Sequence, residues 1–209
     1  LVDLNDASAT LPNSYNSVEN ITPLETPLSS TINGAALATP VFLSLYAEND
    51  LRLDKYFAET DEKGFRKNKK AGSNNYLCTF RVGEIYLTAA EAAARLGELS
   101  QARTRLLELM RKRYAPEAYE AKSVVVNAMD KEALVQEILD ERARELAFEG
   151  HRFWDVRRWK EADKYFVNIE GLQISKTGDN TAYSYSTVVN TRQWDDKMYL
   201  FPIPQSERM

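Results

Sequence analysis

The stretch from Glu141 to Trp159, ERARELAFEGHRFWDVRRW, mixes charged and large aromatic side chains in a way that an ordinary surface helix does not. Successive residues of an α-helix are rotated by about 100°, so apolar residues that lie on one side can be counted. They are Leu134, Val135, Ile138, Leu139 and Leu146. The same arc contains Arg142, Glu145 and Glu149. A charge on the core side survives only when it is paired and hydrogen-bonded, so the sequence predicts a buried ionic network.

The predicted network pairs Arg142 with Glu145 and Glu149, which lie one and two helical turns further on. Removing one partner of a buried ion pair costs roughly 3–5 kcal/mol, so we expect Arg142→Ala to impair folding. The residues that we assign to this network are Glu141, Arg142, Glu145, Glu149, Arg152 and Asp155.

A catalytic alternative exists for the same carboxylates. Glu141, Glu145 and Glu149 follow at four-residue steps, about 6 Å apart, which is near the spacing of the acid and base in a glycosidase. Catalytic carboxylates normally face each other across a cleft from separate elements, whereas these share one helix with several arginines. The pattern therefore favours a structural network, with a glycoside hydrolase as the less favoured alternative.

Other chemistry finds little support in the sequence. His151 is the only histidine and Cys78 the only cysteine, so the sequence has no disulfide and no metal-ligand spacing. The expected partner of His151 is Asp155, four residues further on. We find no hydrolase nucleophile motif and no phosphate-binding glycine loop. The sequence predicts no catalytic residue, no metal and no cofactor.

Composition limits the class of protein. The 209 residues are 44% hydrophobic and 28% charged, which is typical of a folded globular chain. The net charge of −4 gives no general attraction to nucleic acid. The longest apolar run, residues 34–45, is shorter than the roughly 20 residues that a membrane-spanning helix needs.

The helical periodicity is clearest after Phe80. A stripe at i, i+4, i+7 and i+11 predicts a first helix that ends at Gly97, and a second helix, capped by Ser100, is predicted to continue to about Arg113. Together they predict an antiparallel hairpin. The stripe residues are Ile85, Ala89, Ala92 and Leu96 in the first helix, and Ala102, Leu106 and Leu109 in the second.

A third helix is expected from Asp130, as its cap, to about Glu149, with a break at Gly150 before residues 151–159 continue. Short helices are expected near residues 41–46 and after Asn49-Asp50. The other segments read as loops. Residues 1–40 lack periodicity, residues 61–75 suggest an exposed loop or hairpin, and residues 171–190 are loop-like with Tyr183, Tyr185, Val188 and Val189 as strand candidates. Pro202 and Pro204 predict an extended tail that lies along the body.

Several segments resemble the SusD/RagB family of outer-membrane nutrient-binding lipoproteins, in the order in which the family has them. The main signature lies between Glu141 and Trp159. The other matching segments are Asn49–Arg52 with Tyr56-Phe57, Arg81 with Glu84–Leu87 and Ala90–Ala92, Gly97 with Ala102, and Leu200–Glu207. Family members are much longer, so the chain resembles a carboxy-terminal portion of one.

The resemblance implies a mainly α fold, a tetratricopeptide-like helical scaffold with long ordered loops and at most short strands. It implies one domain over residues 1–209, with a loop-rich lead-in at 1–80, a helical core at 81–160 and a loop-rich tail at 161–209. One helical repeat cannot bury its own face, so we expect it to stack on neighbouring helices.

By the same resemblance, the expected function is non-catalytic capture of a nutrient, most often a glycan, at the bacterial outer-membrane surface. The implied partner is a SusC-like TonB-dependent transporter, and the implied lipid anchor would precede this chain. A tetratricopeptide-like protein-interaction scaffold without a small-molecule ligand is the alternative. Glycans bind to flat aromatic faces on loops, which makes Tyr183, Tyr185 and Trp194 ligand candidates, although such aromatics commonly pack a loop onto its helices.

Overall fold

The computed structural model describes residues 1–14, 16–25, 37–60, 62, 64–70, 76–159, 169–177 and 182–192. The chain forms two compact units, Leu1–Arg152 and Phe153–Met209. Helix α8 (His151–Trp159) begins in the first unit and continues in the second. The division into lead-in, helical core and tail remains a prediction. Among the described residues, no helix is both long and apolar enough to cross a membrane.

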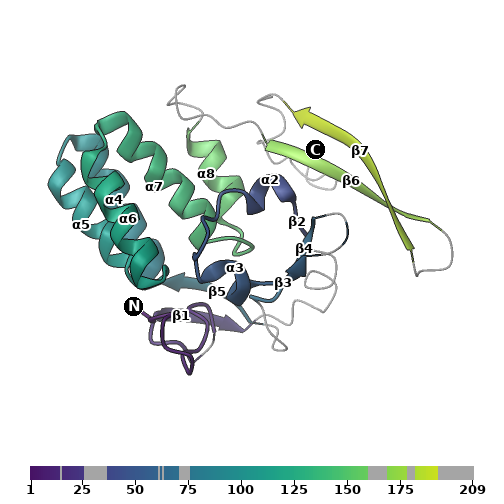
Figure 1. Ribbon diagram of the computed structural model, residues 1–209, viewed down its shortest axis with the longest axis horizontal. Coiled ribbons are helices and arrows are strands. Elements are labelled where there is room, and N and C mark those ends of the chain that lie inside the picture. Colours follow the sequence, from purple (N-terminus) through teal and green to yellow (C-terminus); the bar gives the residue numbers. More distant parts are fainter. Residues whose placement is uncertain are drawn as a thin grey trace, which may run out of the picture. The chain divides into compact units, whose positions relative to one another are not determined.

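Four long helices lie side by side in the first unit (Figure 1). They are α4 (Val82–Leu96), α5 (Leu99–Met110), α6 (Pro116–Ala128) and α7 (Lys131–Glu145). Helix α4 packs against both α5 and α7, and α5 packs against α6. The predicted mainly helical, tetratricopeptide-like class is confirmed.

Strands β1 to β5 and two short helices form the rest of the first unit, β2 to β4 within a three-stranded antiparallel sheet of order β2-β4-β3. Strand β1 pairs with β5. The pairing of β3 and β4 confirms the hairpin predicted for residues 61–75 in its described part, but the predicted exposure is wrong at Phe65 and Lys70, which are buried. The elements are β1 (Asn20–Glu25), β2 (Leu37–Ala38), α2 (Pro40–Leu43), α3 (Arg52–Tyr56), β3 (Phe57–Thr60), β4 (Arg66–Asn68) and β5 (Tyr76–Arg81).

The predicted hairpin of α4 and α5 is confirmed. Gly97 ends α4 in the left-handed conformation at φ 87°, which a residue without Cβ adopts easily. Ala102, Leu106 and Leu109 of α5 are fully buried, as the stripe predicts. The prediction of Ser100 as the cap was wrong, because α5 already begins at Leu99, after Glu98.

The stripe that predicts α4 is not the side of the helix that is buried. The apolar side chains that α4 buries are Leu87, Ala90, Ala93 and Ala94, whereas Ile85 and Leu96 are 40% and 77% exposed. The helix has apolar residues on two faces, and periodicity alone cannot say which face meets the core. The stripe from Ile85 to Leu96 lies on the outward face.

Helix α6 has no counterpart in the sequence analysis. It begins with Pro116, which suits a first helical turn because its missing N–H has no partner there in any helix. Only Val126 of this helix is buried, while Val124 and Val125 are exposed. A helix that buries a single side chain leaves no apolar stripe for a periodicity search to find.

Helix α7 begins as predicted, since Asp130 Oδ1 accepts a hydrogen bond from the N–H of Ala133 at 2.8 Å. It ends at Glu145, earlier than the predicted Glu149. Two residues with positive φ, Phe148 at 61° and Gly150 at 84°, turn the chain into α8. A positive φ is uncommon for a large side chain. The Phe148 ring packs edge-on against Phe42 and Phe57, which holds the turn in place.

In the second unit, β6 (Ile169–Thr177) and β7 (Ala182–Arg192) form an antiparallel pair. This pair occupies the segment that the sequence analysis interpreted as loop-like, and it contains all four strand candidates, Tyr183, Tyr185, Val188 and Val189. The strands extend further than those four residues predict. The proline-containing tail lies outside the described residues.

Candidate functional site

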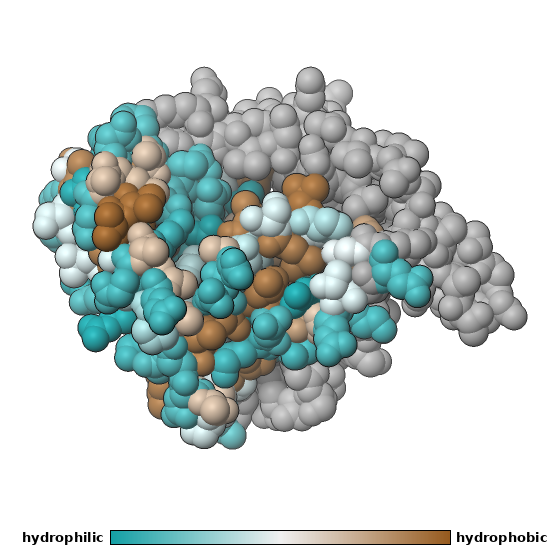
Figure 2. Space-filling model, viewed as in Figure 1, coloured by the Kyte–Doolittle hydropathy of each residue, from teal (hydrophilic) through white to brown (hydrophobic). Residues whose placement is uncertain are grey.

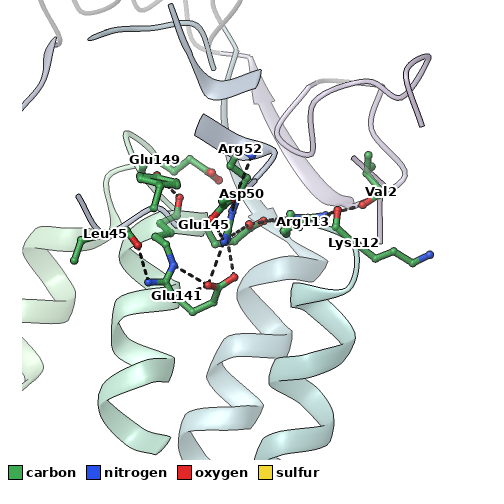
Figure 3. Close-up of polar contacts among 12 residues, drawn as sticks. Val2, Leu45, Asp50, Arg52, Lys112, Arg113, Glu141, Glu145 and Glu149 are labelled. Atoms are coloured by element: carbon green, nitrogen blue, oxygen red, sulfur yellow. Dashed lines mark hydrogen bonds and ion pairs between the residues drawn. The ribbon is translucent and has the colours of Figure 1, made fainter. Parts of the chain in front are cut away.

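Glu141 and Glu145, in the last two turns of α7, lie close to arginines from other parts of the first unit, of which Figure 3 labels Arg52 and Arg113. Glu141 and Glu145 are fully buried, and so are the guanidinium groups that contact them from Arg52, Arg81 and Arg113. Each of these arginines is distant from α7 in sequence. The network therefore joins segments that lie far apart in the sequence.

Glu145 is the centre of the network. Its carboxylate oxygens accept hydrogen bonds from Arg81 Nη1 at 2.7 Å, from Arg113 Nε at 2.9 Å and from Arg52 Nη1 at 3.1 Å. Three cations on one carboxylate leave an excess of positive charge, which other carboxylates must balance. Those carboxylates are Glu19, Asp50, Glu141 and Glu149.

Glu141 binds the second group of cations. Arg52 Nη1 donates to its Oε1 at 2.7 Å, and Arg144 Nη2 lies 2.8 Å from its Oε2. Arg52 also forms a two-point contact with Asp50, through Nε at 2.9 Å and Nη2 at 2.8 Å. A planar guanidinium held by two carboxylates in this way has a fixed orientation.

The carboxyl end of α7 is capped by side chains from elsewhere. The carbonyl of Glu145 accepts from Arg81 Nη2 at 2.9 Å and from Lys70 Nζ at 2.5 Å. Lys70 also contacts the Glu149 carboxylate, which accepts from Arg81 Nε at 2.8 Å. The last carbonyls of a helix have no partner within it and carry partial negative charge, so these cations satisfy them in both respects.

Two further contacts bind the amino-terminal segment into the same network. Arg113 Nη2 donates to Glu19 Oε1 at 2.6 Å, and Arg113 Nη1 donates to the carbonyl of Val2 at 2.6 Å. Glu19 in turn accepts from the N–H of Val2 at 2.8 Å. The amino-terminal segment therefore packs on the helical part of the unit through buried charges.

The sequence analysis identified the carboxylates but missed most of their partners. Glu19, Lys70 and Arg113 carry no local signal, because their burial depends on contacts with residues far away in sequence. Asp50, Arg52 and Arg81 lie in the segments that resemble the family. The presence of arginines in those segments is the one sequence signal that could have pointed to these partners.

The remaining predicted members lie as follows. Arg142 is buried and donates to Thr88 Oγ1 at 3.1 Å. Asp155 is buried in the second unit and accepts from Arg158 Nε at 2.9 Å. Arg152 is half-buried. The expectation that Asp155 partners His151 is corrected, since His151 Nδ1 lies 3.6 Å from Glu84 Oε1.

The surrounding charges determine the titration of the carboxylates. Burial alone would raise the pKa of Glu145, but Arg113, Arg81 and Arg52 hold its pKa well below the usual range. Burial is likewise outweighed at Glu141 by Arg52 and Arg144, and at Glu149 by Arg81 and Lys70, so the pKa of each is lowered. Burial lowers the pKa of Lys70 to about 8 against the opposing effect of Glu149.

These lowered pKa values predict loss of stability in acid. A carboxyl group with a lowered pKa in the folded state contributes stability that is fully present above its unfolded value of 4.5 and is lost as the pH falls through its folded value. We expect the urea midpoint to fall steeply between about pH 5 and pH 3. Asp140, whose pKa burial raises, contributes in the opposite direction. A midpoint that stays constant over this range would contradict the network.

Glu141 and Glu145 are not placed to act as a general acid or base. A general acid or base must reach a substrate, and Glu141 and Glu145 have fully buried side chains whose oxygens are bound by arginines. No group of three or more His, Cys, Asp or Glu side chains among the described residues could hold a metal ion. The network is therefore suited to holding the fold together.

The ligand candidates lie elsewhere. Tyr183 and Tyr185 lie in β7, opposite Lys176 and Ile174 of β6. Trp194 lies outside the described residues. The structure thus assigns the two tyrosines to an antiparallel strand pair and leaves their role in binding a prediction.

Comparison with known proteins agrees with the resemblance noted in the sequence. The sequence pattern of the SusD family matches residues 35–209. A SusD-like protein of Formosa agariphila is 31% identical over 126 residues, which are 60% of this chain and 24% of that protein. The chain therefore spans about a quarter of this curated relative.

Two solved structures are also similar. A SusD-like carbohydrate-binding protein of Bacteroides vulgatus has a TM-score of 0.51 at 22% identity, covering 80% of this chain and 39% of that one. A SusD-like protein of Bacteroides fragilis has a TM-score of 0.43 at 28% identity, covering 69% and 28%. The first supports the fold alone. Since the family pattern covers most of the sequence, the chain belongs to the SusD family.

Proposed function

We propose that this chain is part of a non-catalytic protein that captures a nutrient, most often a glycan, at the bacterial outer-membrane surface. In this proposal the captured nutrient passes to a TonB-dependent transporter, and a lipid anchor outside these residues holds the protein at the membrane. The observation that carries the proposal is family membership over residues 35–209, together with a solved relative described as carbohydrate-binding.

The ionic network supports the non-catalytic part of the proposal. A glycoside hydrolase needs two carboxyl groups that face a sugar across an open cleft, roughly 5 to 9.5 Å apart. The carboxylates that come nearest to this spacing in the sequence, Glu141 and Glu145, have no exposed side-chain surface. They would have to give up several arginine contacts before they could reach any substrate.

The proposed ligand contacts are Tyr183, Tyr185 and Trp194. A tyrosine or tryptophan ring offers an apolar face to the C–H surface of a sugar, while its polar end can form a hydrogen bond. Asn180, Arg192 and Asp195 lie near these aromatics in sequence and could bind hydroxyl groups. The strand pair of β6 and β7 would then serve to position the two tyrosines.

The test is a glycan array followed by titration calorimetry on the full-length polypeptide, with the 209-residue chain in parallel. We expect at least one glycan to bind without being consumed. Tyr183→Ala with Tyr185→Ala should weaken that binding by tenfold or more if these rings contact the sugar. Loss of about 1–3 kcal/mol per stacked ring is the scale known for aromatic platforms. The control is Tyr119→Ala on α6.

Release of a sugar product over time would refute the non-catalytic proposal. Binding that survives both tyrosine substitutions would refute the assigned contacts while leaving glycan capture intact. Binding by the full-length polypeptide together with no binding by the 209-residue chain would place the pocket outside these residues. Failure of every glycan to bind would refute the assignment of the nutrient as a glycan.

A further inference from the structure

Tyr56, the last residue of helix α3, carries a hydroxyl group that is buried and unpaired. The side chain is fully buried, and its hydroxyl has no hydrogen-bond partner among the described residues. Hydrophilic residues cover much of the surface that Figure 2 shows, where water can reach them, but the Tyr56 hydroxyl is out of contact with the solvent. Almost every buried polar group in a folded protein has a partner, either another protein group or a water molecule.

The Tyr56 side chain lies beside the buried ionic network that Glu145 centres. Tyr56 follows Arg52 by four residues in α3, so the two side chains share one face of that helix, and Arg52 Nη1 reaches Glu145 at 3.1 Å. Lys70 Nζ lies 4.4 Å from the centre of the Tyr56 ring and donates to the carbonyl of Glu145. Burial, and after it the charge of Glu145, raises the pKa of the Tyr56 hydroxyl well above its ordinary value, although nearby arginines oppose this effect. The hydroxyl therefore keeps its proton and remains a neutral donor.

Glu145 has no lone pair left for this hydroxyl. Its two oxygens accept five hydrogen bonds from Arg52, Arg81 and Arg113. A carboxylate offers about four lone-pair positions. A direct bond from Tyr56 to Glu145 would therefore displace an arginine, so the partner of the hydroxyl has to be a different group.

An anion does not fit beside the hydroxyl. It would need N–H donors, but each Nη of Arg52, Arg81 and Arg113 already has two acceptors, and each Nε is bonded as well.

The charges of the network are also balanced. Within the described part of the chain, ion pairs link five buried cations to five buried carboxylates, and a sixth, partly exposed carboxylate on the rim, Glu137, is balanced by Lys122. The cations are Arg52, Lys70, Arg81, Arg113 and Arg144, and the carboxylates are Glu19, Asp50, Glu141, Glu145 and Glu149. A neutral ligand keeps this balance, whereas an ion would disturb it.

We propose that one water molecule is bound at the Tyr56 hydroxyl and bridges it to the carboxylates of the network. A water can accept the hydrogen bond of the hydroxyl and donate two of its own, so it needs acceptors rather than donors. The network still has acceptors, because Glu19 Oε2 accepts a single hydrogen bond from the described residues, from Arg81 Nη1 at 3.1 Å. Proteins hold roughly one buried water per 27 residues, and each typically makes about three hydrogen bonds. The bridging water would join the end of α3 to the network.

A crystal structure of the full-length polypeptide tests the proposal, with a second crystal soaked in sodium bromide. We expect one water within about 3.0 Å of Tyr56 Oη that is also bonded to a carboxylate of the network, and no anomalous bromide signal there. A protein atom bonded directly to Oη would overturn the proposal. A bromide peak would also overturn it, because it would identify an anion. The same holds if no density lies beside Oη in a crystal whose other buried waters are visible.

Tyr56→Phe gives an independent readout, because phenylalanine keeps the ring and removes only the hydroxyl. Tyr46→Phe is the matched control, since the buried Tyr46 hydroxyl donates directly to the carbonyl of Arg144 at 2.8 Å. We expect each substitution to lower the urea midpoint of the same polypeptide by about 0.5 M, the shift that loss of one hydrogen bond causes. A midpoint that stays constant or rises in Tyr56→Phe alone would mean that the hydroxyl is unpaired, which would overturn the proposal. If Tyr56→Phe fails to fold, the crystal structure of the parent still decides.

Discussion

Replacing Glu145 by glutamine is expected to lower the free energy of unfolding by about 3–5 kcal/mol. Glutamine keeps the size of the side chain but removes the charge that Arg52, Arg81 and Arg113 share. These guanidinium groups are fully buried and remain charged at any pH at which the protein folds. Each of the three would lose a charged partner, and the buried network as a whole would lose one negative charge. Single domains are stable by only about 5–15 kcal/mol, so this change removes a large part of the total.

Urea unfolding followed by circular dichroism measures the effect, provided that the slope with denaturant is the same for variant and parent. Glu108→Gln is the matched control, because it removes the same charge from an exposed pair with Arg105 at 3.4 Å. An exposed pair is worth about 1 kcal/mol or less, so the control should change stability little. Equal effects at positions 108 and 145 would mean that Glu145 is not the centre of a buried network.

The sequence predicts the buried carboxylates because local periodicity reports which face of a helix is apolar. Glu145 shares its face with Leu134 and Ile138, and a charge at such a position needs partners whatever the rest of the fold may be. Periodicity cannot name those partners. Arg52 and Arg81 reach Glu145, and Glu19 reaches Arg81, only after long stretches of chain have folded back, so these contacts depend on the tertiary arrangement.

The outward face of α4, which carries the stripe from Ile85 to Leu96, shows a second limit of sequence reasoning. The stripe from Ile85 to Leu96 correctly predicts a helix, but it does not mark the side of that helix that is buried. Both faces are apolar, since alanine occupies much of the helix. A helix that contacts neighbours on two sides would have this composition.

Helix α6 illustrates the opposite case. Its apolar residues Val124 and Val125 are exposed and only Val126 is buried, so tertiary contacts contribute little to its formation. A proline at its start and the good helix formers of its first half, Glu117, Ala118, Glu120, Ala121 and Lys122, favour the helix locally. Local propensity without an apolar stripe is a weak signal, which explains why periodicity did not find this helix.

Gly83→Ala is expected to lower the free energy of unfolding by about 2–3 kcal/mol. Alanine is normally favoured over glycine within a helix by about 1 kcal/mol, so the expected sign is the reverse of the usual one. A Cβ at position 83 would lie 2.5 Å from Arg81 Nη1, 3.1 Å from Glu145 Oε1 and 3.2 Å from Glu19 Oε2. The tip of an arginine is usually free to move away. Here Arg81 is held by Glu19, Glu145 and Glu149, so moving it breaks charged hydrogen bonds.

Ala89→Gly is the matched control for this change. Ala89 lies in the same helix on the outward face, where the side chain is exposed. Its replacement by glycine should lower the free energy of unfolding by about 1 kcal/mol through helix propensity alone. Comparing the two substitutions by urea unfolding separates the propensity of α4 from the crowding at its first turn. If Gly83→Ala instead stabilised the protein by the amount that Ala89→Gly destabilises it, the close approach of α4 to Arg81 and Glu145 would be wrong. The expected result follows if α4 can begin beside the buried charges only because position 83 has no side chain.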